Sequence, residues 1–220
     1  MPTPIEPKLH TFKDWTFRLK SASSGSVRLF LLLHGWKGDE NSMWIFSRNL
    51  PEHYTFLAPR GLYADPGGGY SWRKIVPGTW GFPSLDNLRP AADALIQFVD
   101  EWSILTGIDA SRVTVAGFSQ GAALTYTLAL LYPERIHTFA ALSGFLPNGA
   151  QFLLEARSLA GKRVFVAHGR ADDMVPVERA REAVRMLEVS GVDVDYCESD
   201  AGHKVSRDCV RGVEAFFKAF

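Results

Sequence analysis

Short runs of aliphatic and β-branched residues recur along the chain and end at turn-forming residues. Most of these runs are continuously apolar rather than alternating, which is typical of strands buried on both faces of a sheet. The pattern predicts strands at residues 27–34, 54–58, 112–116, 138–142, 163–167 and 192–197.

Apolar residues recur every three or four positions between these runs, which predicts helices. Such patterns cover parts of 91–105, 180–187 and 205–216. Strands that alternate with helices predict an α/β fold with a mostly parallel central sheet covered by helices on both faces. Ligands bind beyond the carboxyl ends of the strands in such sheets, so we expect the chemistry in the loops that follow the strands.

Length and charge narrow the choice of protein class. The 220 residues include 24 Lys and Arg against 24 Asp and Glu, so the formal net charge is zero. A neutral chain without runs of like charge lacks the basic surface that nucleic acids require. We find no repeat and no linker between halves of different composition, so we predict one domain over residues 1–220.

The N-terminal sequence and the cysteines bear on location. The first residues do not resemble a secretory signal, and no apolar run approaches the ~20 residues of a membrane span, so stable membrane insertion is not expected. Cys197 and Cys209 are too few for a disulfide framework and lie in no metal-binding pattern. We predict two free thiols, a cytoplasmic location and no metal or other cofactor.

A nucleophile motif follows one of the predicted strands. Residues 117–121 read Gly-Phe-Ser-Gln-Gly and precede a helix-forming run, which is the strand–turn–helix context of the G-x-S-x-G turn. Glycines flank Ser119 because side chains on either side of so sharp a turn would collide with backbone. The start of the following helix also favours an anion beside the serine. The alternative is a glycine-rich turn whose serine merely caps the helix.

A serine nucleophile needs a base and a group that orients the base. Asp172 and Asp173 follow one predicted strand, and His203 follows the last one. The chain order of serine, aspartate and histidine is that of an α/β-hydrolase triad, although the sequence hardly separates the two aspartates. His203 has an alternative as an exposed residue before a helix.

Two further loops match an oxyanion hole, which needs two N–H donors. The residue after the nucleophile, Gln120, supplies one, and we assign the other to Trp36, which follows an apolar strand and a His-Gly turn. We interpret His34 and His168, which each precede a glycine at a strand end, as hydrogen-bonded residues that shape loops.

Together these residues resemble the phospholipase/carboxylesterase family of α/β-hydrolases, which includes acyl-protein thioesterases and small carboxylesterases. The matching segments are Leu-His-Gly at 33–35, the serine motif, Ala-Leu-Ser-Gly at 141–144, residues 168–176 and Gly-His at 202–203. The resemblance implies an α/β-hydrolase fold without a large lid domain. It also implies that Asp172 is the acid and that residues 68–72, with Tyr70 and Trp72, belong to the acyl pocket.

Three features depart from the family pattern or add to it. Lys37 takes a place where a glycine is usual, and the segment after Trp72 is basic. Residues 75–83 are aromatic and form either a flap or a packed surface loop.

The motifs and the family resemblance together predict a serine carboxylesterase for small ester substrates with short to medium acyl chains. An acyl-protein thioesterase or lysophospholipase-type activity, or a ligand-binding homologue without turnover, is the alternative.

Overall fold

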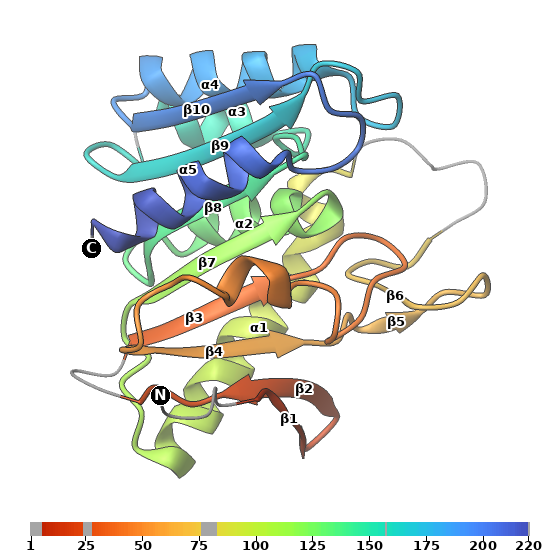
Figure 1. The fold of residues 1–220 in the computed structure, drawn as a ribbon, viewed down its shortest axis with the longest axis vertical. Helices are drawn as coiled ribbons and strands as arrows, with labels where there is room; N and C mark the ends of the chain where they lie inside the picture. Colours follow the sequence, from red (N-terminus) through yellow and green to blue (C-terminus); the bar gives the residue numbers. More distant parts are fainter. Residues whose placement is uncertain (1–5, 24–27, 76–82, 157, 220) are drawn as a thin grey trace.

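An eight-stranded sheet forms the centre of the molecule in the computed structural model, which describes residues 6–23, 28–75, 83–156 and 158–219 (Figure 1). The strand order is β1-β2-β4-β3-β7-β8-β9-β10, and the strands from β4 to β10 run parallel while β1 and β2 form antiparallel pairs. The strands are β1 (Lys8–Phe12), β2 (Trp15–Lys20), β3 (Arg28–Leu33), β4 (Tyr54–Pro59), β7 (Val113–Phe118), β8 (Ile136–Leu142), β9 (Arg163–Gly169) and β10 (Asp193–Ser199). The short strands β5 (Tyr63–Ala64) and β6 (Tyr70–Ser71) form a separate two-stranded sheet.

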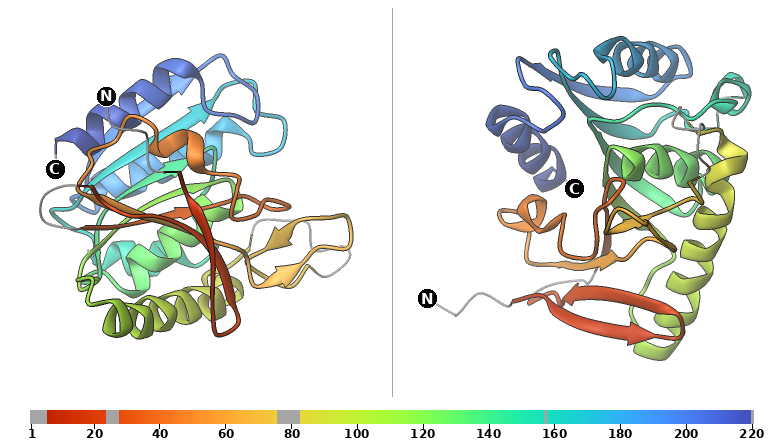
Figure 2. Two further views of the ribbon diagram at one scale, coloured as in Figure 1. Left: turned by 60° about the horizontal axis from the view of Figure 1, so that its bottom comes forward. Right: turned by 90° about the vertical axis from the view of Figure 1, so that its right-hand side faces the viewer.

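Helices cover both faces of the sheet, as predicted (Figure 2). The helices are α1 (Leu85–Thr106), α2 (Gln120–Leu131), α3 (Ala150–Glu155), α4 (Val177–Val189) and α5 (Arg207–Lys218), with a 3-10 turn η1 (Trp44–Ser47). One hydrophobic core lies between the sheet and α1 to α4, and a second lies beneath η1 and α5. Figure 2 shows these two groups of helices on opposite sides of the sheet.

The six predicted strands correspond to β3, β4 and β7 to β10, with ends that differ by a few residues. Strand β3 is buried at every position after Arg28, and β4 is buried throughout, which explains their continuous apolar runs. Strands β1 and β2 were not predicted. They form an antiparallel hairpin at the edge of the sheet, where β1 is largely exposed and β2 is half-buried, so their sequence lacks an apolar run.

The helices α1 and α2 show why one was easier to predict than the other. Helix α1 has a buried apolar stripe, begins at a capping box between Ser84 and Asn87, and ends at Gly107 with φ 71°. Helix α2 is buried from Gln120 to Leu130, so it is apolar all round and has no stripe.

The prediction of two free thiols is wrong, because Cys197 of β10 and Cys209 of α5 form a disulfide. Their separation of 12 residues indicated no pairing, but α5 turns back across β10 and brings the two Cα atoms to 5.6 Å. The disulfide therefore closes the segment that contains His203.

Two further observations concern the outline of the molecule. Among the described residues, no helix combines the length and the apolar character needed to cross a membrane. The described connections at the carboxyl ends of the strands are loops and the short β5–β6 hairpin, without a large lid. Of the aromatic segment 75–83, residues 76–82 lie outside the described part of the chain.

Candidate active site

The predicted catalytic residues meet at the carboxyl ends of neighbouring strands. Ser119 follows β7, Asp172 follows β9 and His203 follows β10, while the loop that begins at His34 follows β3. Parallel strands place all these ends at one edge of the sheet.

The turn at Ser119 has the strained backbone that the motif predicts. Ser119 has φ 54° and lies between β7 and α2, where its N–H donates to Leu142 O at 2.8 Å. A Cβ added to Gly117 would lie 2.2 Å from Gly121 O, and one added to Gly121 would lie 2.2 Å from Leu33 O. Both flanking positions therefore exclude a side chain, and the hydroxyl of Ser119 lies at the start of α2.

A chain of hydrogen bonds links the three predicted residues. Ser119 Oγ lies 3.0 Å from His203 Nε2, and His203 Nδ1 lies 2.7 Å from Asp172 Oδ2. Asp172 accepts a hydrogen bond, so the proton belongs on Nδ1 and leaves Nε2 as the acceptor for the serine hydroxyl. The side chain of Asp172 is fully buried, whereas that of His203 is 14% exposed. Nε2 is thus the polar atom that can exchange a proton with Ser119.

Backbone groups and a second loop hold the acid and the base in place. Asp172 Oδ1 accepts the N–H groups of Met174 at 3.0 Å and Val175 at 2.8 Å. The loop with His203 packs on the loop with Asp172, where Ala171 N–H donates to Ala201 O at 3.0 Å. Asp173 is exposed, so the structure brings Asp172 and not its neighbour against His203.

The two other histidines at strand ends shape loops, as predicted. His34 Nε2 accepts Gly61 N–H at 2.9 Å, and its Nδ1 lies 2.7 Å from Gly35 O. Burial lowers the pKa of His34, so the neutral ring that can make both contacts is favoured. His168 Nε2 lies 2.8 Å from Val175 O and supports the loop of Asp172 from the buried side.

The backbone of the loop after β3 lies beside the nucleophile. A Cβ added to Gly35 would lie 3.2 Å from Ser119 Cβ, so the chain at Gly35 and Trp36 passes directly along the serine. The loop is held as a turn by Gly38 N–H donating to Gly35 O at 3.0 Å, and by Lys37 N–H donating to Tyr70 O at 2.9 Å. It therefore has a defined position next to the start of α2.

Trp72 has a different surrounding from the acyl pocket that the resemblance implies. Its side chain has no exposed surface, because the indole is packed in the core and donates from Nε1 to His34 O at 2.8 Å. Its backbone N–H donates to Gln120 Oε1 at 2.8 Å. Trp72 thus joins the loop of His34 to the first residue of α2, and its burial leaves no surface for a substrate. Tyr70 is half-buried, and its backbone holds the loop of Lys37.

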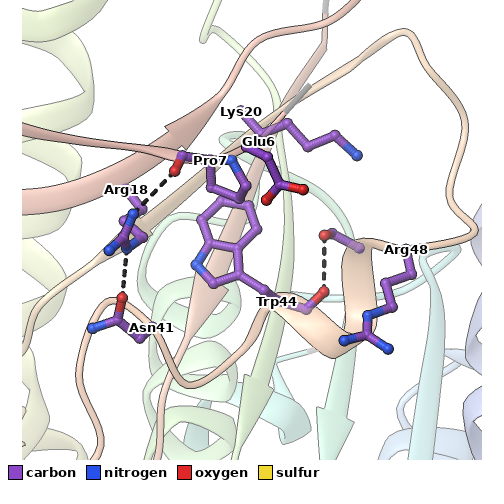
Figure 3. A pocket seen from close by; sticks show the side chains of 8 residues that line it. Glu6, Pro7, Arg18, Lys20, Asn41, Trp44 and Arg48 are labelled. Carbon is purple, nitrogen blue, oxygen red and sulfur yellow. Dashed lines mark hydrogen bonds between the residues drawn. The ribbon is translucent and has the colours of Figure 1, made fainter. Parts of the chain in front are cut away.

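Cavities of similar size lie on different parts of the surface, and one of them adjoins the serine turn. A cavity of about 380 Å³ adjoins the serine turn and is lined by Gly35, Trp36, Phe118, Lys204 and other residues. A cavity of about 520 Å³ lies between β2 and η1 and has no residue of the serine turn in its lining. Figure 3 shows this second cavity, with Trp44 between Arg18 and Arg48. Volume alone therefore does not identify the reactive site.

We searched the described residues for side chains that could bind a metal ion together. No group of three or more His, Cys, Asp or Glu side chains is arranged there to hold a metal ion. The reactive arrangement consists of a hydroxyl, an imidazole, a carboxylate and backbone N–H groups.

Several known proteins are similar to this chain in sequence or in structure. A probable carboxylesterase, SOBER1-like, from Arabidopsis thaliana is 30% identical over 81% of this chain and 67% of its own length. Acyl-protein thioesterase 1 from Kluyveromyces lactis is 28% identical over 78% of this chain and 81% of its own length. The crystal structure of a carboxylesterase from Mesorhizobium loti superposes with a TM-score of 0.80 at 25% identity, covering 96% of this chain and 97% of that one.

The family model described as Phospholipase/Carboxylesterase matches residues 16–220, which include every strand at the site and all three residues of the hydrogen-bonded chain. The fold, the serine turn and the sequence match agree, and the chain belongs to the phospholipase/carboxylesterase family of α/β-hydrolases.

Proposed function

We propose that this protein is a serine carboxylesterase that cleaves esters with short to medium acyl chains through an acyl-enzyme. The observation that carries the proposal is the unbroken path from Ser119 Oγ through His203 to Asp172, at 3.0 and 2.7 Å. Membership of a family with carboxylesterase relatives supports hydrolysis as the reaction class.

The geometry supports a role for each residue. Ser119 Oγ attacks the ester carbonyl carbon while His203 Nε2 takes the hydroxyl proton. Asp172 orients the imidazole and stabilises the imidazolium that forms. The carbonyl oxygen becomes an oxyanion, which the backbone N–H groups of Gln120 and Trp36 bind.

The intermediate then collapses and the C–O bond to the leaving alcohol breaks. His203 returns its proton to the departing alkoxide, which leaves the acyl group on Ser119. Water enters, gives a proton to His203 Nε2 and attacks the acyl carbon. Breakdown of this second intermediate releases the carboxylic acid and restores the serine hydroxyl. The mechanism uses no cofactor.

A thioesterase is the second candidate. The observation in its favour is the similarity to acyl-protein thioesterase 1 of Kluyveromyces lactis. The same acyl-enzyme forms from an ester or a thioester, because only the leaving group differs. Turnover of an alkyl ester and a thioester with the same acyl chain separates the two proposals, and kcat/KM decides between them.

The principal experiment is labelling with a fluorophosphonate, followed by peptide mapping, together with hydrolysis of p-nitrophenyl esters of increasing acyl length. We expect labelling at Ser119 and the highest kcat/KM at short to medium chains. Ser119→Ala should lose both labelling and turnover. Ser23→Ala, which changes an exposed serine bonded to Glu52, is the control and should retain both. Near wild-type hydrolysis by Ser119→Ala contradicts the proposal, and ligand binding without turnover would favour the non-catalytic homologue.

A cytoplasmic location remains a prediction, and the disulfide provides a test of it. Disulfides persist in oxidising compartments and are rare in the cytoplasm. Trapping thiols in intact cells before lysis reports the state of Cys197 and Cys209. A reduced pair fits the cytoplasm, whereas a bonded pair places the protein in an oxidising compartment.

A further inference from the structure

The cavity beside the serine turn combines an apolar floor with positive charge. Buried Met43 and Phe46, with partly buried Phe118 and Val205, supply the apolar surface. Lys37 and Lys204 line the same cavity, and both side chains are exposed. The volume of about 380 Å³ is in the range of small-molecule sites.

The position of the cavity relative to His203 indicates which part of an ester it holds. Lys204 and Val205 directly follow His203, and the ring of Phe118 lies 5.1 Å from the His203 ring. His203 must donate a proton to the leaving group, so the leaving group lies on its side of Ser119. The cavity therefore lies on the side of Ser119 from which the leaving group departs.

The carboxylates near the cavity have other partners, and Asp65 offsets part of the charge of Lys37. Glu40 pairs with Arg60 at 2.8 Å, and Asp39 accepts hydrogen bonds from Asn41 and Ser42 within its own turn. Lys37 Nζ lies 4.9 Å over the Trp36 ring, near the partly exposed Asp65.

Asp65 itself already accepts Trp36 Nε1–H at 2.7 Å and Gly67 N–H at 2.8 Å. Within the described residues, the ammonium of Lys204 has no ion pair within 4 Å. Lys204 is thus the stronger candidate for binding an anionic group, and Lys37 adds to the positive electrostatic potential of the cavity.

We propose that this cavity is a leaving-group site for alcohols or thiols with an apolar body that ends in an anionic group such as a carboxylate. The apolar body packs on Met43 and Phe46, and the anionic end lies between the ammonium groups of Lys37 and Lys204. This inference rests on the proposed esterase function and specifies the substrates that the esterase prefers.

The test compares two butyrate esters that share an acyl chain and differ by one carboxylate. One is the ester of 4-nitrophenol, and the other is the ester of 5-hydroxy-2-nitrobenzoic acid, which is the same phenol with an added carboxylate. The readout is the ratio of kcat/KM for the charged ester to kcat/KM for the neutral one. We expect a ratio above one in the wild type, and a lower ratio in high salt because ions screen the attraction.

Variants of the two lysines change the ratio in a defined order. Lys204→Gln should lower the ratio about two- to fivefold, the effect of one exposed charge, and Lys204→Glu should lower it further. Lys37→Asn should lower it as well, since asparagine tolerates the φ of 64° at that position. Lys218→Gln, at the far end of α5, removes the same charge away from the site and should leave the ratio unchanged.

The possible outcomes separate this inference from the proposed function. Turnover of both esters at a ratio that neither Lys204→Gln nor Lys204→Glu changes overturns the leaving-group site and leaves the esterase standing. A wild-type preference for the neutral ester also overturns the leaving-group site and leaves the esterase standing. Absence of turnover of both esters, with no fluorophosphonate label on Ser119, overturns the esterase and this inference together.

Discussion

Trp72 shows how one residue can support both halves of the proposed oxyanion hole. Its indole N–H bonds the carbonyl oxygen of His34, and its backbone N–H bonds the side chain of Gln120. Preorganised donors stabilise an oxyanion only if their backbone is held in place before the reaction. Trp72, which the family resemblance assigns to the acyl pocket, therefore holds the backbone of the two loops that carry the proposed oxyanion donors.

Trp72→Phe keeps an aromatic ring and removes the indole N–H, which leaves the buried His34 carbonyl oxygen without this donor. Leaving a buried acceptor unsatisfied costs about 1–3 kcal/mol. We expect kcat for ester hydrolysis to fall about tenfold with KM little changed, which corresponds to about 1.4 kcal/mol lost in the transition state. Steady-state kinetics and the rate of fluorophosphonate labelling measure the effect.

Trp44→Phe is a matched control for this variant. Trp44 also donates its indole N–H to a backbone carbonyl, that of Glu40 at 2.8 Å, but it lies in η1 and has no bond to His34 or Gln120. It should lower stability without lowering kcat. An unchanged kcat in Trp72→Phe would show that the oxyanion loop does not depend on Trp72.

At the scale of elements, the base of the proposed triad lies on a segment that is fixed at both ends. Strand β10 pairs with β9 before His203, and α5 follows it from Arg207, capped by Ser206, whose hydroxyl accepts Cys209 N–H at 3.2 Å. The Cys197–Cys209 disulfide joins the strand to the first turn of the helix. The covalent bond and the cap together restrict the positions that His203 can take.

The double variant Cys197→Ser/Cys209→Ser removes the disulfide without leaving a reactive thiol. Cross-linking a loop of this length stabilises a protein by about 2–3 kcal/mol, because it restricts the unfolded chain. We expect the free energy of unfolding measured in urea to fall by that amount, with a lower midpoint. A reductant should destabilise the wild type similarly and leave the variant unaffected. Equal stability of the wild type with and without reductant, once thiol titration shows full reduction, contradicts this prediction.

An ion pair between α4 and β10 makes stability depend on pH. Two hydrogen bonds from Arg181, at 2.7 and 2.9 Å, and one from Tyr196 lower the pKa of Glu198 from 4.5 to about 2. A carboxyl whose pKa is lower in the folded state adds stability above its unfolded pKa. It loses that stability as the pH falls toward the folded value.

Arg181→Gln should therefore lower the free energy of unfolding at pH 7 by a modest amount, because the arginine is partly exposed. The difference from the wild type should shrink as the pH falls from 4.5 toward 2. Urea unfolding at several pH values measures it. Arg185→Gln removes a neighbouring exposed arginine of α4 as the control. A difference that is constant across the pH range would exclude Glu198 as its source.

At the scale of the whole molecule, the same sheet supports both hydrophobic cores. Strands β3, β4, β7, β8 and β9 contribute side chains to the core under α1 to α4 and to the core under η1 and α5. Loss of the sheet would expose both cores at once, which favours cooperative unfolding.

We predict that the oxidised protein unfolds in one transition, as expected for a single domain over residues 1–220. Calorimetry should give equal calorimetric and van't Hoff enthalpies, and fluorescence and far-ultraviolet circular dichroism should report the same midpoint. Two separate transitions, or a trypsin-resistant fragment that retains only one of the cores, would indicate two folding units instead of one.

How much of the site could be predicted depended on whether the signal was local. The serine turn and the strand ends are patterns of neighbouring residues and were predictable, and the order of Ser119, Asp172 and His203 follows from the strand ends on which they lie. The edge hairpin β1–β2 was not, because one exposed strand and one half-buried strand carry no apolar run. The role of the Gln120 side chain was also missed, since its partner at Trp72 is 48 residues away in the chain.

The sequence by itself determined the local features of this protein: buried strands, helices, the glycine-flanked serine and the membership of a hydrolase family. Apolar periodicity and turn chemistry act over a few residues, so these features are recognisable in the amino-acid sequence alone. Only the tertiary structure decided that Cys197 and Cys209 bond, that Trp72 is buried, and that Asp172 faces His203. Those contacts depend on how helices and loops pack on the sheet, because packing brings together residues whose spacing along the chain carries no such signal.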